Sequence, residues 1–226
     1  MLQAHVQSNE NKRIESLVSY SILDSLPEED YDNLTAIAAS ICNTPVSLIS
    51  LIDDKRQWFK SHHGLDASAT AREFAFCAHA INDPNNIFSV GDARNDERFR
   101  DNPLVTGEPH VIFYAGVPLV NHDGFALGTL CVIDHKPSKL SEEQLTGLKA
   151  LSKQVMNLLE MRKMRMEYEA ALKSLEQKNE DLERFAYVAA HDLKTPVVNI
   201  MSMGRLFLKM FGQSLDERGW EILDII

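Results

Sequence analysis

One long stretch without glycine or proline limits most strongly what this chain can fold into. Neither residue occurs between positions 148 and 195, and apolar residues recur there with a helical period. A continuous helix of that span would be about 70 Å long. From Tyr168 onward, steps of four and three place an apolar seam at Tyr168, Leu172, Leu175, Asn179, Leu182, Ala186, Ala189, Leu193, Pro196, Ile200, Met203, Phe207 and Met210. This a/d pattern predicts a coiled coil that continues into a helical bundle.

His191 and Asp192 lie outside that seam. With Leu172 at position a, Ala189 falls at d and Leu193 at a, so His191 falls at f, the most exposed heptad position. An imidazole nitrogen is a good nucleophile near neutral pH, and an adjacent carboxylate can orient the ring and accept its other proton. The pair therefore suits phosphoryl chemistry, whereas the simpler alternative is a surface histidine on a solvated helix face.

The segment around this pair, Phe185–Pro196, reads FAYVAAHDLKTP. It resembles the phospho-accepting motif of sensor histidine kinases in two-component systems. The resemblance implies that His191 accepts the γ-phosphoryl group of ATP and that Asp192 is its base or orienter. It also implies that Thr195 orients the water of a phosphatase reaction and that Pro196 bends the helix.

The same resemblance places ATP and Mg²⁺ on a separate kinase domain. No Asn-rich box or Gly-rich lid of such a domain occurs in these 226 residues, so we expect no kinase activity from this chain alone. The chain is then either part of a longer kinase or a short partner phosphorylated in trans, and its status as an enzyme stays open. Leu208–Gln213 is predicted to form the turn of a helical hairpin and Leu215–Ile226 the start of its second helix.

Charge and hydropathy exclude several classes of partner. The net charge of −10 argues against binding to nucleic acid by bulk electrostatics. No apolar stretch approaches the ~20 residues that a membrane-spanning helix needs. Cys42, Cys77 and Cys131 are an odd number of cysteines in apolar contexts, which fits a reducing compartment. We therefore expect a cytoplasmic protein with no membrane span.

Alternating helical and strand patterns before residue 140 predict an α+β domain. Ile14, Val18, Ile22 and Leu23 indicate a first helix, and the capping-box spacing of Ser25–Glu28 predicts the start of a second. The inner face of this second helix is predicted to carry Tyr31, Leu34, Ile37, Ala38 and Ile41. Strands are predicted at Val46–Ile52 (half-buried), Arg56–Ser61, Ile87–Val90, Val111–Val120 and Phe125–Ile133. The remaining predictions are a short helix at Glu73–Ile81, a polar loop at Asp92–Asn102, a hairpin turn at Asn121–Gly124 and a helix cap at Ser141–Gln144.

Several short segments of this domain, over about residues 10–162, resemble a GAF domain. They are Ile22–Glu28, Leu51–Asp53, Arg56–Lys60, Phe76–Ile81, Asp96–Phe99, Asn102–Val105, Phe113–Leu119 and Gly128–Asp134. The resemblance implies a PAS-like fold, with a central antiparallel sheet, outer helices and a ligand pocket between the sheet and its covering loops. The predicted organisation is a GAF sensor domain at 1–160, a coiled-coil signalling linker at 161–184 and a partial phospho-acceptor and dimerisation domain at 185–226.

The expected ligand pocket draws on aromatic and polar residues of these segments, although the aromatics could instead simply fill the core. The candidates are Trp58, Phe59, Phe76, Cys77, His79, Arg98, Phe113 and Tyr114. One position departs from the family pattern: Ile112 stands where GAF sequences of this type carry a basic residue. The resemblance therefore implies that this chain has lost the ability to bind an anionic ligand that other members of the family bind through that residue. The ligand itself is not identified.

Other chemistries are less well supported by the sequence. A zinc site could combine His62, His63, Cys77 and His79, but no second Cys/His pair follows at a finger-like spacing, so we expect no metal. Cys77 lacks the His-Pro context of bilin-binding GAF domains. A thiol-based GAF enzyme would pair Cys77 with Cys131, yet both lie in apolar runs, where buried thiols are usually inert.

The leading function is therefore the signal-sensing and phospho-accepting part of a sensor histidine kinase. Asn179 at an a position favours a parallel homodimer. The expected further partners are a response-regulator receiver domain and an ATP-binding kinase domain, in cis or in trans. A non-catalytic GAF module that binds ligand and dimerises is the main alternative, and a thiol-based enzyme a weaker one.

Overall fold

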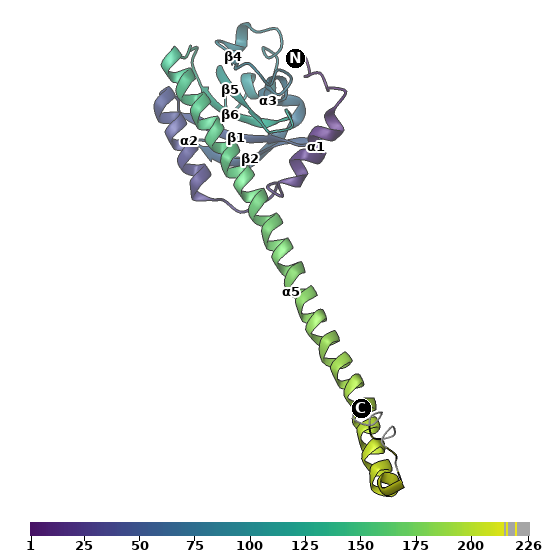
Figure 1. The fold of residues 1–226 in the computed structure, drawn as a ribbon. Helices are drawn as coiled ribbons and strands as arrows, with labels where there is room; N and C mark the ends of the chain where they lie inside the picture. Colours follow the sequence, from purple (N-terminus) through teal and green to yellow (C-terminus); the bar gives the residue numbers. More distant parts are fainter. Residues whose placement is uncertain (215, 217–219, 221–226) are drawn as a thin grey trace. The chain divides into compact units, whose positions relative to one another are not determined.

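The computed structural model describes residues 1–214, 216 and 220, within two compact units, Met1–Met166 and Glu167–Ile226 (Figure 1). The sensor unit, Met1–Met166, contains every strand of the described chain. The second unit holds the C-terminal part of one long helix. Apart from residues 216 and 220, the predicted second arm of a helical hairpin, Leu215–Ile226, lies outside the described residues.

A six-stranded antiparallel sheet forms the centre of the sensor unit. Its strands are β1 (Val46–Ile52), β2 (Arg56–His63), β3 (Ala69–Ala71), β4 (Phe88–Val90), β5 (Phe113–Val120) and β6 (Ala126–Asp134). Their order across the sheet is β3-β2-β1-β6-β5-β4, which makes β1 and β6 the central pair. The sheet follows from β-branched and large apolar residues in runs that end at turn-forming residues.

Five α-helices accompany the sheet within the described part of the chain. They are α1 (Glu10–Ser19), α2 (Glu29–Cys42), α3 (Phe76–Ala80), α4 (Pro103–Thr106) and α5 (Glu142–Phe211), with short 3-10 turns at Arg72–Phe74, Ala93–Asn95 and Gly212–Ser214. The expected α+β fold, with a central antiparallel sheet, outer helices and a long C-terminal helix, is thereby confirmed. The helix includes most of the predicted hairpin turn at Leu208–Gln213, since α5 ends only at Phe211. Within the described residues, no helix is long and apolar enough to cross a membrane.

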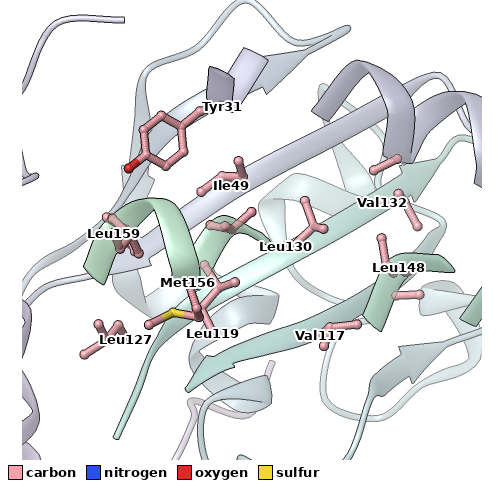
Figure 2. Close-up of a cluster of buried hydrophobic side chains, with 14 of the residues drawn as sticks. Tyr31, Ile49, Val117, Leu119, Leu127, Leu130, Val132, Leu148, Met156 and Leu159 are labelled. Atoms are coloured by element: carbon pink, nitrogen blue, oxygen red, sulfur yellow. The ribbon is translucent and has the colours of Figure 1, made fainter. Parts of the chain in front are cut away.

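Two hydrophobic cores cover the two faces of the sheet. Helices α1, α2 and the first turns of α5 pack on one face, where Leu148, Met156 and Leu159 of α5 meet Ile49, Leu119 and Leu130 of the sheet (Figure 2). Helix α3 and the connections around it cover the other face. Strand β1 is therefore buried along its whole length, and the prediction that it is half-buried was wrong. Apolar packing on both faces stabilises a sheet of this kind.

Local signals near turns and helix starts were predicted with mixed success. The cap at Ser141–Gln144 is confirmed: the Ser141 amide donates to Gln144 Oε1 at 2.9 Å, and the Gln144 amide donates to Ser141 Oγ at 3.2 Å. The hairpin turn is confirmed as well, with Asn121 Oδ1 accepting from the Phe125 amide at 2.9 Å. Both signals depend only on neighbouring residues, so they can be identified without tertiary information.

The predicted cap at Ser25 was wrong, and the predicted inner face of α2 is confirmed only in part: Tyr31 and Ala38 are buried and Leu34 is partly buried. Helix α2 begins at Glu29 without a side-chain cap, and Ser25 Oγ accepts a hydrogen bond from Lys60 Nζ at 2.9 Å instead. The buried residues of α2 are Tyr31, Thr35, Ala38, Ala39 and Cys42, whereas Ile37 and Ile41 stay exposed. The Thr35 hydroxyl lies 2.8 Å from Ser61 Oγ. A polar contact with the sheet therefore helps to place Thr35 on the buried face of α2, a position that hydrophobic periodicity does not predict.

An ionic cluster, named here the Glu28 joint, connects the sheet, the segment before α2 and the first part of α5. It consists of Lys60, Glu28 and Arg162, with Lys60 Nζ 2.7 Å and Arg162 Nη1 2.9 Å from Glu28 Oε1. Lys60 Nζ also donates to the Leu26 carbonyl at 2.6 Å, and its side chain is 0% exposed. A buried ammonium group needs such a full set of acceptors.

Candidate functional site

A cavity of about 410 Å³ lies on the face of the sheet that α3 covers. Its walls come from β1, β2, β5 and β6, from α3, and from the segments 65–70 and 104–111. The apolar lining residues are Leu48, Phe59, Leu65, Ala67, Phe76, Leu104, Pro109, Val111 and Ile133, and the polar ones are Gln57, Asp66, Thr70, Cys77, Glu108 and Tyr114. This volume falls in the range of small-molecule sites, about 300–1,000 Å³.

The period of the strands decides which aromatics reach the cavity. Neighbouring residues of a strand point to opposite faces, so Phe59 and Tyr114 line the cavity while Trp58 and Phe113 belong to the core on the other face. Phe76 stacks on Tyr114, with ring centroids 5.2 Å apart. Of the aromatic pocket candidates, the structure brings Phe59, Phe76 and Tyr114 together.

Sequence reasoning missed Gln57 and Thr70 as wall residues. Gln57 precedes Phe59 by two positions, so the strand period could have placed it on the same face. Its amide donates to Ser50 Oγ at 3.2 Å. The Thr70 hydroxyl is buried and has no hydrogen-bond partner among the described residues. Buried polar atoms are normally paired, so an unpaired one in a cavity wall indicates where a ligand atom could bind.

Cys77 lies at the cavity wall inside a buried polar cluster. Its Sγ is 3.1 Å from the Tyr114 hydroxyl and 3.0 Å from Thr129 Oγ1. Burial alone would raise the pKa of Cys77, but hydrogen bonds from Cys131, Thr129 and Tyr114 outweigh it and lower that pKa to about 7. Burial holds the pKa of Cys131 well above its ordinary value. Because both side chains are 0% exposed, the pair is closed to bulky reagents.

His79 and Arg98 do not line the cavity and form a separate aromatic cluster. The His79 ring packs edge-on against Phe99 at 4.9 Å, and the Arg98 guanidinium lies over Phe88 at 4.9 Å while pairing with Asp96 at 2.6 Å. Burial lowers the pKa of His79, and the positive charge of Arg98 lowers it further. His79 is therefore neutral near pH 7.

No constellation suited to a metal emerges from the described part of the chain. Within residues 1–214, 216 and 220, no group of three or more His, Cys, Asp or Glu side chains could hold a metal ion. Cys77 contacts Tyr114 and Thr129, whereas His79 contacts Phe99. The zinc alternative gains no support from this arrangement.

In the second unit, His191 and Asp192 lie on α5. Their side chains are 69% and 73% exposed, and His191 Nδ1 is 3.3 Å from Asp192 Oδ1. An ionised carboxylate only accepts hydrogen bonds, so this contact favours the tautomer that carries the proton on Nδ1 and the lone pair on Nε2. Thr195 is exposed on the same helix, which continues through Pro196.

Comparison with protein families and curated proteins concerns the sensor unit. Residues 26–159 match the model of the GAF domain family. A cyclic di-GMP phosphodiesterase of Pseudomonas aeruginosa is 42% identical over 149 residues, which cover 66% of this chain and 25% of that protein. The phytochrome-like protein Cph1 of Synechocystis is 34% identical over 77 residues, which cover 33% of this chain and 10% of that protein. The chain thus spans a quarter or less of the length of these relatives.

Solved structures share the fold at low sequence identity. The GAF domain of PixJ from Thermosynechococcus elongatus, in its blue-light-absorbing form, aligns with a TM-score of 0.52 and 16% identity, over 74% of this chain and 97% of that one. The GAF domain of an Acinetobacter phosphoenolpyruvate-protein phosphotransferase aligns with a TM-score of 0.50 and 20% identity, over 69% of this chain and 95% of that one. A free methionine-R-sulfoxide reductase of Neisseria meningitidis aligns with a TM-score of 0.50 and 15% identity, over 73% of this chain and 98% of that one. At such identities the likeness concerns the fold alone.

Proposed function

The chain belongs to the GAF domain family, and we propose that it is the signal-sensing and phospho-accepting part of a two-component sensor histidine kinase. In this proposal residues 1–160 sense a small ligand, 161–184 form a coiled-coil linker and 185–226 contribute part of the phospho-acceptor domain. The observation that carries it is the exposed His191–Asp192 pair on the helix that leaves the sensor unit.

The proposed chemistry uses both nitrogens of His191. Nε2 attacks the γ-phosphorus of an ATP molecule held with Mg²⁺ by a separate kinase domain. The bond from that phosphorus to the β,γ-bridging oxygen breaks, and ADP leaves with the electron pair. The Nδ1 proton is stabilised by, or passes to, the Asp192 carboxylate 3.3 Å away. A receiver-domain aspartate then takes the phosphoryl group, and Thr195 would orient water for the reverse, dephosphorylating function.

Dimerisation is part of the proposal because a row of large apolar side chains on α5 is uncovered in the single chain. Seam residues Leu175, Leu182 and Leu193 are more than 60% exposed. Apolar surface of this extent is unfavourable in water and usually marks an interface. A second copy in parallel would cover the row and place Asn179 opposite its own counterpart, an arrangement that favours a parallel dimer.

Phosphate transfer tests the proposal. We expect the chain to take up acid-labile, base-stable label from labelled ATP when a histidine-kinase ATP-binding domain is supplied in trans. His191→Gln should abolish the label, because the glutamine amide is not a nucleophile. His63→Gln, which changes an exposed histidine of the sensor unit, is the matched control and should keep it.

Label that persists in His191→Gln would contradict the phospho-acceptor assignment. If the chain takes up no label, the same assay with a second histidine-kinase ATP-binding domain decides the matter. A second blank would favour the alternative function.

That alternative is a non-catalytic GAF module that binds a ligand and dimerises through α5. Two observations favour it: the cavity is built entirely from the sensor unit, and a 42% identical segment occurs in a cyclic di-GMP phosphodiesterase. A GAF domain can therefore serve other output domains. A thiol-based function is less well supported, since neither Cys77 nor Cys131 is exposed.

A further inference from the structure

The charge of the cavity lining restricts the ligand. Among the residues that line it, Asp66 and Glu108 carry negative charge near pH 7, and the buried thiol of Cys77 has its pKa lowered to about 7. None of the lining residues is a lysine, arginine or histidine. Both carboxylates are exposed at the rim. The Asp66 carboxylate has no hydrogen bond or ion pair within the described residues, whereas Glu108 Oε1 lies 3.9 Å from His110 Nε2. A negatively charged ligand would find no cation in this cavity and a carboxylate at its entrance.

The surrounding basic groups do not change this conclusion. His62, next to the rim, has Nδ1 2.7 Å from the Leu65 carbonyl, and His110 lies beside Glu108 outside the lining. Arg98 pairs with Asp96 and stacks on Phe88. Moving an anion from water into a mostly apolar cavity without a charged partner is strongly unfavourable.

The interior of the cavity favours a ring with a polar substituent. Phe59, Phe76 and Tyr114 present aromatic surface, against which flat molecules pack well. The Thr70 hydroxyl lacks a partner among the described residues, and the residue lines the cavity. One hydrogen bond to that hydroxyl would satisfy it.

We propose that this cavity binds a small, mostly apolar ring compound that carries no negative charge and makes a hydrogen bond to Thr70. The inference rests on the proposed sensing function and adds the class of ligand. It excludes phosphate-bearing and carboxylate-bearing molecules, such as nucleotides, as ligands of this site. Neutral and cationic compounds both fit, because the exposed rim carboxylates tolerate either.

Three matched indole probes test the class by titration calorimetry on the 226-residue chain: tryptophol (neutral), tryptamine (cationic) and indole-3-acetate (anionic). We expect the first two to bind at least about tenfold more tightly than the third. Thr70→Val, which keeps the shape of the side chain, should weaken tryptophol binding about fivefold, the usual effect of one lost hydrogen bond. Asp66→Lys should shift the tryptamine-to-acetate ratio about fivefold toward acetate. Glu15→Lys, the same charge change on exposed α1, should leave that ratio unchanged.

Two results would overturn the inference. Binding of indole-3-acetate as tight as that of tryptophol, abolished by filling the cavity with Ala67→Phe, would keep the cavity as the ligand site and reject the ligand class. Absence of binding by all three probes would reject the class as well. Neither result bears on His191, whose label transfer is measured separately.

Discussion

Replacing Glu28 with alanine is expected to lower the free energy of unfolding by about 3 kcal/mol, the lower end of the range for breaking a buried ion pair. The Glu28 joint explains the size of the effect. Without this carboxylate, the fully buried ammonium group of Lys60 keeps only neutral acceptors, Ser25 Oγ and the Leu26 carbonyl, and Arg162 loses its charged partner. Urea unfolding followed by the fluorescence of buried Trp58 measures the change.

Two further variants make this test specific. Glu29→Ala removes an exposed carboxylate from the next position, where only the helix dipole is affected, and should cost less than about 1 kcal/mol. Lys60→Met combined with Glu28→Ala should lose less stability than the sum of the two single changes, because the double variant removes the fully buried ammonium group that Glu28→Ala alone leaves without a carboxylate. If Glu28→Ala and Glu29→Ala lower the free energy of unfolding equally, the Glu28 joint does not contribute to stability.

Gly128→Ala is expected to destabilise the sensor unit by about 3 kcal/mol or more, or to prevent folding. Gly128 lies in β6 between Leu51 of β1 and Leu119 of β5. A Cβ atom added there would lie 1.9 Å from the Ser50 carbonyl oxygen and 2.8 Å from Leu51 Cα. Both atoms belong to the backbone of the central strand pair, so no side-chain rotation can relieve the overlap.

Gly91→Ala is the control for this change, because the nearest atom to an added Cβ, the Ser138 carbonyl oxygen, is 3.5 Å away. This variant should stay within about 0.5 kcal/mol of the wild type. Thermal unfolding followed by circular dichroism compares the two, and a Gly128→Ala chain that is unfolded at every temperature counts as the expected result. Similar melting temperatures for both variants would contradict the close approach of β1 and β6.

Sequence alone predicted the elements whose signals are local. The Ser141–Gln144 cap, the Asn121–Gly124 turn and the long helix each follow from neighbouring residues and were confirmed. The start of α2 was predicted wrongly and its inner face correctly only in part, because Ser25 and Thr35 contact Lys60 and Ser61, residues distant in the sequence. Tertiary contacts of that kind leave no periodic trace.

The candidate ligand site was also predictable only where its signals are local in the sequence. Aromatic residues of the GAF-like segments indicated a pocket, but they included Trp58–Phe59 and Phe113–Tyr114, neighbours that cannot share a face of a sheet. The strand period leaves one residue of each pair for the cavity, and only the covering helices decide which one. The unpaired Thr70 hydroxyl and the Cys77–Thr129 contact depend on three-dimensional packing, so no sequence pattern could have indicated them.

Nitrogen-15 NMR of the histidine-labelled chain after phosphoryl transfer tests the central proposal most directly. Correlations from the ring protons distinguish phosphate on Nε2 from phosphate on Nδ1, and the His191→Gln chain identifies the signal. Because Nδ1 faces Asp192 at 3.3 Å, the phosphoryl group should be found on Nε2 of His191 and on no other histidine. Phosphate on Nδ1, or on any other histidine of the chain, would contradict the proposed role of the His191–Asp192 pair.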